Sequence, residues 1–221
     1  MKKETSKQTL GEEIANAISH GIMAIFGIVA LILLIIKSNT AREYVGAFVF
    51  GFSIILLYSM STLYHAMRYG GKAKEVFKRM DHLSIYVLIG GSFAPALLLL
   101  QGLQKPLFNI SGFPEVGLTL FTIQWILIAI GVIFKSIWIK KFAKLHVFLY
   151  LAMGWSALVF VEVLNKYSPQ AFYLVLFGGI AYSVGVIFYS LPKFKYFHFI
   201  WHIFTALGTI LQFVAFYVYL Y

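Results

Sequence analysis

The sequence contains no cysteine and few charged residues. Only 12% of its 221 residues are Asp, Glu, Lys or Arg, about half of what a soluble domain carries. The lack of cysteine excludes disulfides and thiolate metal sites, so any transition-metal site must use His, Asp or Glu. The low charge and the 61% content of hydrophobic residues exclude an ordinary soluble domain. We therefore expect an all-α integral membrane protein.

The apolar residues form blocks of the length that a membrane-spanning helix needs, about 20 residues. Gly and Ser recur inside these blocks, which favours close packing between helices. The N-terminal segment, residues 1–16, is polar and lacks a signal-peptide cleavage site, so we expect the first span to be retained. Residues 1–221 are thus predicted to form a single domain, a seven-transmembrane helix bundle. Its seven predicted spans are 17–36, 44–66, 82–101, 117–137, 142–163, 171–190 and 197–220.

The net charge of +10 would suggest a nucleic-acid partner in a soluble protein. Here the basic residues lie in short segments between spans, so we expect contacts with anionic lipid and no nucleic-acid partner. With the N-terminus inside, 14 Lys and Arg residues fall on the inner side and 4 on the outer side. The positive-inside rule then predicts a cytoplasmic N-terminus and an outside C-terminus. The basic run "RYGGKAKEVFKR", residues 68–79, is predicted to be a solvated loop.

Every histidine is predicted to lie near the cytoplasmic face. Interfacial histidines can simply extend their polar ends to water, and for His82 and His146 this remains the simpler interpretation. The segment "HFIWH" is different, because residues four apart share one face of a helix and can hold one ion together. The six histidines are His20, His65, His82, His146, His198 and His202.

A catalytic zinc site needs three protein ligands and one open position. His198 and His202 supply two ligands, and the best candidate for the third is His65, at the cytoplasmic end of the second span. Ser61 lies one turn before His65 on the same face. Neutral imidazoles and carboxylates suit Zn²⁺ among the common ions, so we expect Zn²⁺ as the cofactor.

Acidic and amide side chains are predicted beside these histidines. Asp81 is the only Asp in the chain and begins the third span, where it could orient a water molecule or a ligand. It could instead act only as a helix cap or a dipole partner. Glu13, Asn16 and His20 share one helix face. They are expected to form a hydrogen-bonded patch packed against the site, or else a first-turn contact with lipid headgroups.

Several of these motifs together resemble the hemolysin III family of bacterial membrane proteins. They are "SMSTLYH" at the end of the second span, "MDHLSIYVLIGGSFAP" at the start of the third and "HFIWH" at the start of the seventh. That family belongs with the progestin and adipoQ receptors, which include the adiponectin receptors. Glu13, Asn16, Ser19 and His20 resemble the opening motif of that superfamily, Glu-x-x-Asn-x-x-Ser/Thr-His. The resemblance covers essentially the whole chain.

The resemblance implies a seven-helix fold with a cytoplasmic N-terminus and a zinc ion held by His65, His198 and His202. It also implies that Asp81 lies near the water held by zinc, with Ser61 close by. The adiponectin receptors and the related alkaline ceramidases are thought to hydrolyse lipid amides within the membrane. The resemblance therefore implies a zinc-dependent hydrolase of a lipid amide or ester, acting on membrane lipids in the bacterial plasma membrane and contributing to membrane homeostasis.

In such a hydrolase Asp81 would accept a proton from water and pass it to the leaving group, and Ser61 would hydrogen-bond the developing oxyanion. Two alternatives remain open. One is a non-enzymatic membrane protein in which zinc joins helices, as in structural zinc sites. The other is a cytolytic pore-former, which the family name reflects. Most ionisable groups lie at the span ends, and this argues against a water-filled pore.

Overall fold

The structure is a computed structural model that describes residues 8–138, 141–191 and 194–221. In these residues six helices are long and apolar enough to cross a membrane, and a bent helix pair can supply a seventh span. The fold class is therefore confirmed as an all-α membrane protein. The long helices are α1 (Leu10–Lys37), α2 (Ala41–Ala66), α3 (Lys72–Leu99), α4 (Val116–Ile137), α7 (Pro169–Tyr189) and α8 (Phe197–Tyr219).

The predicted span 142–163 is not one continuous helix. It consists of α5 (Ala143–Trp155), the 3₁₀ helix η3 (Ser156–Val159) and α6 (Val161–Tyr167), and the two parts of the span meet at 52°. The change from α to 3₁₀ geometry comes at Ser156, just after Gly154, and both are poorer helix formers than Ala or Leu. The bend itself follows at Phe160. The Ser156 hydroxyl also donates to the Met153 carbonyl at 2.6 Å, a local bond that competes with helix continuation.

Two helices begin earlier than the apolar blocks predict. Helix α1 starts at Leu10, not at residue 17, because Thr9 and Glu12 form a reciprocal capping box. Helix α3 starts at Lys72, not at residue 82, so the interpretation of 68–79 as a solvated loop is wrong from Lys72 onward. An apolar block marks only the part of a helix inside hydrocarbon.

Five of the lysines counted for the membrane orientation lie outside the residues that the structure describes. They are Lys2, Lys3, Lys7, Lys140 and Lys193.

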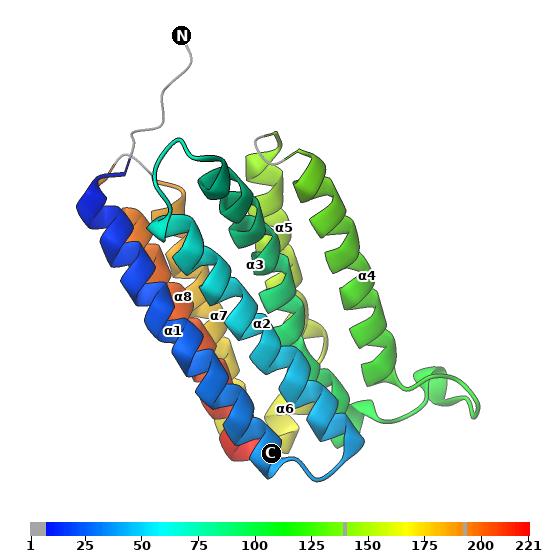
Figure 1. Cartoon of the computed structure of the whole chain (residues 1–221). Coiled ribbons are helices and arrows are strands. Elements are labelled where there is room, and N and C mark those ends of the chain that lie inside the picture. The colour runs from blue at the N-terminus through cyan, green and yellow to red at the C-terminus, as the bar shows by residue number, and fades with distance from the viewer. Residues whose placement is uncertain (1–7, 139–140, 192–193) are drawn as a thin grey trace.

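The helices pack mainly against their neighbours along the chain, and α1 also packs against α8. Helix α3 contacts both α2 and α4, and α7 contacts α8. Figure 1 shows the start of α1 and the C-terminus at opposite ends of the bundle. The ends of α2 and the starts of α3 and α8 lie at the same end of the bundle as the start of α1 (Figure 1).

The bundle interior changes from polar to apolar along α1. Its buried face carries Asn16 and His20 near the start of the helix and Gly27 and Leu34 further on, while many of its isoleucines are exposed. An apolar outer face suits contact with lipid. The glycines allow close packing, as predicted: a Cβ atom on Gly27 would lie 2.7 Å from Ile54 Cγ2 of α2.

Candidate metal centre

Three histidines from two helices converge where α2 ends and α8 begins. His65 comes from α2, and His198 and His202 come from successive turns of α8. One ring nitrogen from each lies within 4.8 Å of the others. The side chains of His65 and His202 are buried, with residue exposures of 3% and 0%. The structure thus brings together the three residues that the sequence suggested as metal ligands.

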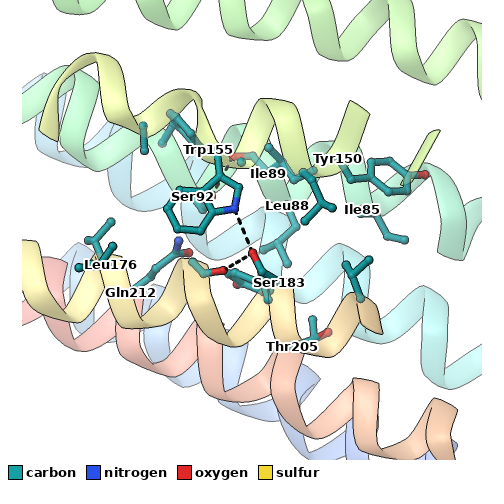
Figure 2. A pocket seen from close by; sticks show the side chains of 18 of the residues that line it. Ile85, Leu88, Ile89, Ser92, Tyr150, Trp155, Leu176, Ser183, Thr205 and Gln212 are labelled. Carbon is teal, nitrogen blue, oxygen red and sulfur yellow. Dashed lines mark hydrogen bonds between the residues drawn. The ribbon is translucent and has the colours of Figure 1, made fainter. Parts of the chain in front are cut away.

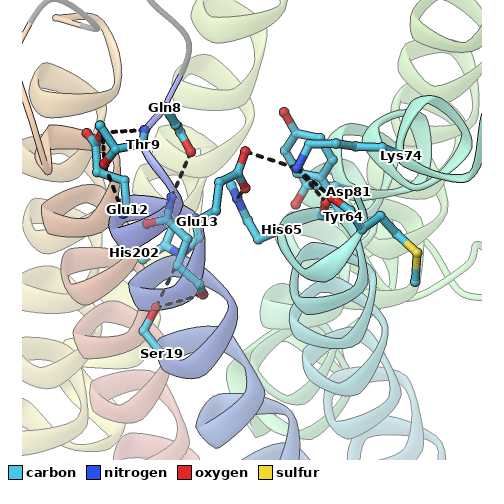
Figure 3. A network of polar contacts seen from close by, with 12 residues as sticks. Gln8, Thr9, Glu12, Glu13, Ser19, Tyr64, His65, Lys74, Asp81 and His202 are labelled. Atoms are coloured by element: carbon cyan, nitrogen blue, oxygen red, sulfur yellow. Dashed lines mark hydrogen bonds and ion pairs between the residues drawn. The ribbon is translucent and has the colours of Figure 1, made fainter. Parts of the chain in front are cut away.

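Hydrogen bonds fix the ring of His65 in the tautomer that a metal needs. Its Nδ1 lies 2.7 Å from Oε2 of Glu13, on α1 (Figure 3). A carboxylate can only accept, so Nδ1–H of His65 donates. In the neutral ring Nε2 then carries the free lone pair, and this atom is buried without a hydrogen-bond partner. Metal-bound histidines commonly use such a carboxylate contact to set their orientation.

The same reasoning applies to His202. Its Nδ1 lies 3.3 Å from the hydroxyl oxygen of Ser19, and that hydroxyl donates to the Asn16 carbonyl at 3.0 Å. Since the Ser19 proton is used there, Ser19 accepts from Nδ1–H of His202, leaving Nε2 with its lone pair. Nε2 of His202 and Nε2 of His198 are also buried without partners. Three clustered histidines, each with an unpartnered Nε2, fit a bound Zn²⁺, which favours imidazole ligands.

His20 lies beside this cluster but is oriented differently. Its ring stacks on His202 with centroids 3.4 Å apart and an interplanar angle of 6°. It also contacts Tyr58 edge-on, at a centroid distance of 4.8 Å. His20 is fully buried and neither of its nitrogens has a hydrogen-bond partner. Helix α1 therefore makes two contacts with the site. The ring of His20 stacks on His202, and the carboxylate of Glu13 bonds His65.

Asp81 lies on α3 at the edge of the cluster and is buried, with 7% of its surface exposed. Its Oδ2 is 3.3 Å from Nδ1 of His82. It also lies near enough to His65 and Ser61 to interact electrostatically with both. The Ser61 hydroxyl is fully buried and makes no hydrogen bond of standard geometry. A carboxylate and a hydroxyl thus flank the three imidazoles.

The remaining histidines have other partners. His146 is buried on α5, and its Nδ1 lies 2.7 Å from the hydroxyl of Tyr86 on α3. His82 makes a 2.7 Å contact from Nδ1 to the Lys78 carbonyl, besides its contact with Asp81. Among the described residues these two are not part of the group that could hold a metal. Asn16 bonds Gln8 through its side-chain amide at 3.0 Å and accepts from the Ser19 hydroxyl through its carbonyl.

One residue of the site was not found from the sequence. Lys74, placed in a solvated loop by the sequence, is buried in the first turn of α3 and pairs with Glu13 at 2.9 Å. The missed signal is helical spacing: Lys74 precedes Asp81 by two turns, so both lie on the same face once α3 is extended to Lys72.

An apolar cavity of about 150 Å³ lies beside the cluster, between α3, α5, α7 and α8 (Figure 2). Near one part of its wall, Trp155 Nε1 donates to the Ser183 hydroxyl at 3.0 Å. Tyr189 and Trp201 line the cavity and also contact the ring of His198, at centroid distances of 6.0 and 5.4 Å. The cavity and the histidine cluster therefore share a wall.

Comparison with known proteins identifies the family of this chain. The family model described as haemolysin-III related matches residues 8–213. The chain is 42% identical to Hemolysin-3 of Bacillus cereus over 217 residues, which cover 96% of this chain and 94% of that protein. It is 41% identical to the Hemolysin-3 homolog of Bacillus subtilis over 209 residues, covering 93% and 92% of the two chains. Human Monocyte to macrophage differentiation factor is 26% identical over 220 residues, covering 97% and 87%. The chain therefore belongs to the haemolysin-III-related family of multi-pass membrane proteins.

Proposed function

We propose that the protein is a zinc-dependent hydrolase that cleaves an amide or ester bond of a lipid within the bacterial plasma membrane. The observation that carries this proposal is the group of His65, His198 and His202, with Asp81 beside it. Each histidine has a ring nitrogen within 4.8 Å of the others and a buried Nε2 without a hydrogen-bond partner. A bound zinc ion would supply Lewis-acid chemistry, polarising a carbonyl and making water a stronger nucleophile at neutral pH. With three protein ligands, a fourth position stays open for chemistry.

The chain's own residues have separate roles in the proposed reaction. Asp81 accepts a proton from the attacking water and passes it to the leaving nitrogen or oxygen as the carbon–heteroatom bond breaks. His82 adjoins that carboxylate, with Nδ1 3.3 Å from it, while its Nδ1–H donates to the Lys78 carbonyl at 2.7 Å. Ser61 donates its hydroxyl proton to the oxyanion that develops on the carbonyl. The products are a fatty acid and an amine or alcohol.

The apolar cavity supports a lipid as the substrate. Its walls are mainly aliphatic and aromatic, and they suit an acyl chain rather than a polar metabolite. Tyr189 and Trp201 adjoin both the cavity and His198. An acyl chain in the cavity would direct its carbonyl end past these rings toward the imidazoles.

The first test is metal content together with turnover. The protein is purified in mild detergent without added metal, beside His65→Ala and His202→Ala, and bound metals are quantified by mass spectrometry. We expect about one zinc per wild-type chain and loss of zinc from both variants. The zinc-loaded wild type is then assayed with lipid amides and esters. Wild-type protein without zinc, or a zinc-loaded protein without turnover on any of these lipids, contradicts the hydrolase.

A structural zinc is the second candidate, and the position of the ligands favours it. His65 ends α2 while His198 and His202 begin α8, so one ion would join two helices that are far apart in the chain. Structural metal sites contribute directly to folding. Zinc removal distinguishes the two candidates. If the ion is structural, the zinc-loaded protein has no lipid turnover, and removal of zinc causes a large fall in thermal stability. If the protein is a hydrolase, the zinc-loaded protein turns over lipid, and this turnover disappears with the metal.

We propose that the metal centre lies near the cytoplasmic face. The 14 to 4 distribution of Lys and Arg supports a cytoplasmic N-terminus. The centre is formed by the first two turns of α8 and the last turn of α2, with Glu13 from the first turn of α1, at the end of the bundle where α1 starts (Figure 1). The proposed reaction would then take place at the level of the inner leaflet.

A further inference from the structure

Lys74 is a buried lysine with an unusually complete set of partners. Only 6% of its surface is exposed. Its Nζ lies 2.9 Å from Oε1 of Glu13 and donates to the carbonyls of Tyr64 and Met67 at 3.1 and 3.3 Å. The same ammonium lies 4.7 Å from the centroid of the Tyr64 ring. An ammonium has three protons, and three oxygen acceptors surround this one.

These contacts connect Lys74 to His65 by two routes (Figure 3). Through the side chains, Lys74 holds Oε1 of Glu13 while Oε2 of the same carboxylate holds Nδ1 of His65. Through the backbone, Lys74 binds the carbonyl of Tyr64, the residue just before His65, in the last turn of α2. Carbonyls in the last turn of a helix lack partners within the helix, so Lys74 also fixes the helix end that carries His65.

We propose that Lys74 is a positioning residue for the metal centre: it holds the Glu13 carboxylate so that Glu13 sets the tautomer and direction of His65. The inference rests on the metal site of the proposed function and extends it to a residue that does not touch the metal. Without Lys74, the Glu13 carboxylate would lose its only ion-pair partner besides His65 among the described residues. It would then be free to turn toward water, because its side chain is 14% exposed.

The charge of Lys74 matters because the Glu13 carboxylate is largely buried. A buried carboxylate is costly without compensating charge or hydrogen bonds. Lys74 Nζ and His65 Nδ1 each face one oxygen of that carboxylate, at 2.9 and 2.7 Å. Because Glu13 is held from both sides, Nδ1 of His65 stays directed at the carboxylate and Nε2 stays available to a metal.

The test is a double-mutant cycle on zinc affinity in detergent, measured by competition with a zinc-binding fluorophore. The variants are Glu13→Gln, Lys74→Met and the double variant, with Lys72→Met as the control. Lys72 is an exposed lysine in the same helical turn. Methionine keeps an unbranched apolar stem in place of the lysine stem. Thermal unfolding of the zinc-free proteins reports separately whether each variant folds.

We expect Glu13→Gln to weaken zinc binding 10- to 100-fold, the usual loss for partners of metal-bound histidines, and Lys74→Met to weaken it about 10-fold. The double variant should bind within about twofold of Glu13→Gln alone, because both changes act on one contact. Lys72→Met should bind like the wild type. Wild-type affinity in a folded Lys74→Met protein, or a double variant whose loss is the product of the two single losses, overturns the role of Lys74. Wild-type protein that binds no zinc overturns the metal site itself.

Discussion

The rings of His20 and His202 lie face to face, 3.4 Å apart and 6° from parallel. An imidazole nitrogen offers its lone pair in the plane of its ring. An ion in the plane of His202 is therefore displaced from the plane of His20 by about the stacking distance. This geometry separates His20 from the three histidines that could share an ion, although His20, His65 and His202 are all buried.

The stacking predicts that His20→Phe keeps the metal. Phenylalanine preserves the flat contact with His202 and removes two buried nitrogens that have no partner, so we expect about one zinc per chain and a change in unfolding free energy below about 1 kcal/mol. Metal analysis and thermal unfolding in detergent measure both quantities. His202→Phe is the matched control and should lose the zinc. A folded His20→Phe protein without zinc would identify His20 as a ligand.

If Asp81 moves the proton in the proposed reaction, Asp81→Asn should retain zinc and lose turnover. An amide cannot accept the proton, and loss of a general acid–base group costs about 10²- to 10⁴-fold in rate. The measurement is the initial rate of lipid hydrolysis at matched zinc content. Glu75→Gln, an exposed acid on the same helix, should keep the wild-type rate. An unchanged rate in Asp81→Asn would remove Asp81 from the mechanism.

Helix packing predicts a position-specific effect of alanine in place of glycine. A Cβ atom on Gly91 of α3 would collide with the Ser53 side chain and lie 3.0 Å from the Val49 carbonyl oxygen of α2. Overpacking of this kind costs about 1–3 kcal/mol, so Gly91→Ala should lower resistance to unfolding by denaturing detergent. Gly179→Ala in α7 meets no atom within 4 Å and should leave that resistance unchanged or higher. Equal behaviour of the two variants would contradict this packing of α2 on α3.

A pH-dependent contact lies at the start of α2, at the end opposite to the metal centre. Arg42 forms two bonds with Glu115, at 2.6 and 2.8 Å, and this hydrogen-bonded guanidinium lowers the pKa of the Glu115 carboxyl. A lowered folded-state pKa means that the contact stabilises the protein above the unfolded pKa of about 4.3 and loses this effect as pH falls through the folded-state pKa. Because the pair is exposed, we expect less than about 1 kcal/mol.

The corresponding measurement is the difference in melting temperature between the wild type and Glu115→Gln at low salt. The difference should be present at pH 7, shrink in acid below the folded-state pKa of Glu115 and fall with added salt. A difference that grows in acid would have the wrong sign for this ion pair.

The absence of cysteine allows a direct test of orientation. Single cysteines at Lys72, near the metal centre, and at Lys105, in the connection between α3 and α4, are both at exposed positions. If the N-terminus is cytoplasmic, a membrane-impermeant thiol reagent should label position 105 in intact cells and position 72 only after lysis. The reverse pattern would place the metal centre on the outer side.

The sequence was sufficient to predict the membrane class and nearly all the spans, because the cost of placing polar groups in hydrocarbon acts on each segment separately. It was less accurate at the ends of helices. Helix α1 begins at a capping box and α3 begins at Lys72, since hydrogen bonding continues a helix beyond the apolar core. The change to 3₁₀ geometry at Ser156 and the bend at Phe160 were missed because the apolar pattern of 142–163 continues through both.

For the site, spacing alone placed His198 and His202 on one helix face, and the alternation of spans placed His65 and Asp81 at the same level. Only the tertiary structure decided which histidines face one another, because that depends on how each helix is rotated about its axis. It also decided that Glu13 bonds His65, that His20 stacks flat on His202, and that Lys74 is buried. These contacts join residues on different helices, and no local pattern in the chain encodes the rotation that brings them together.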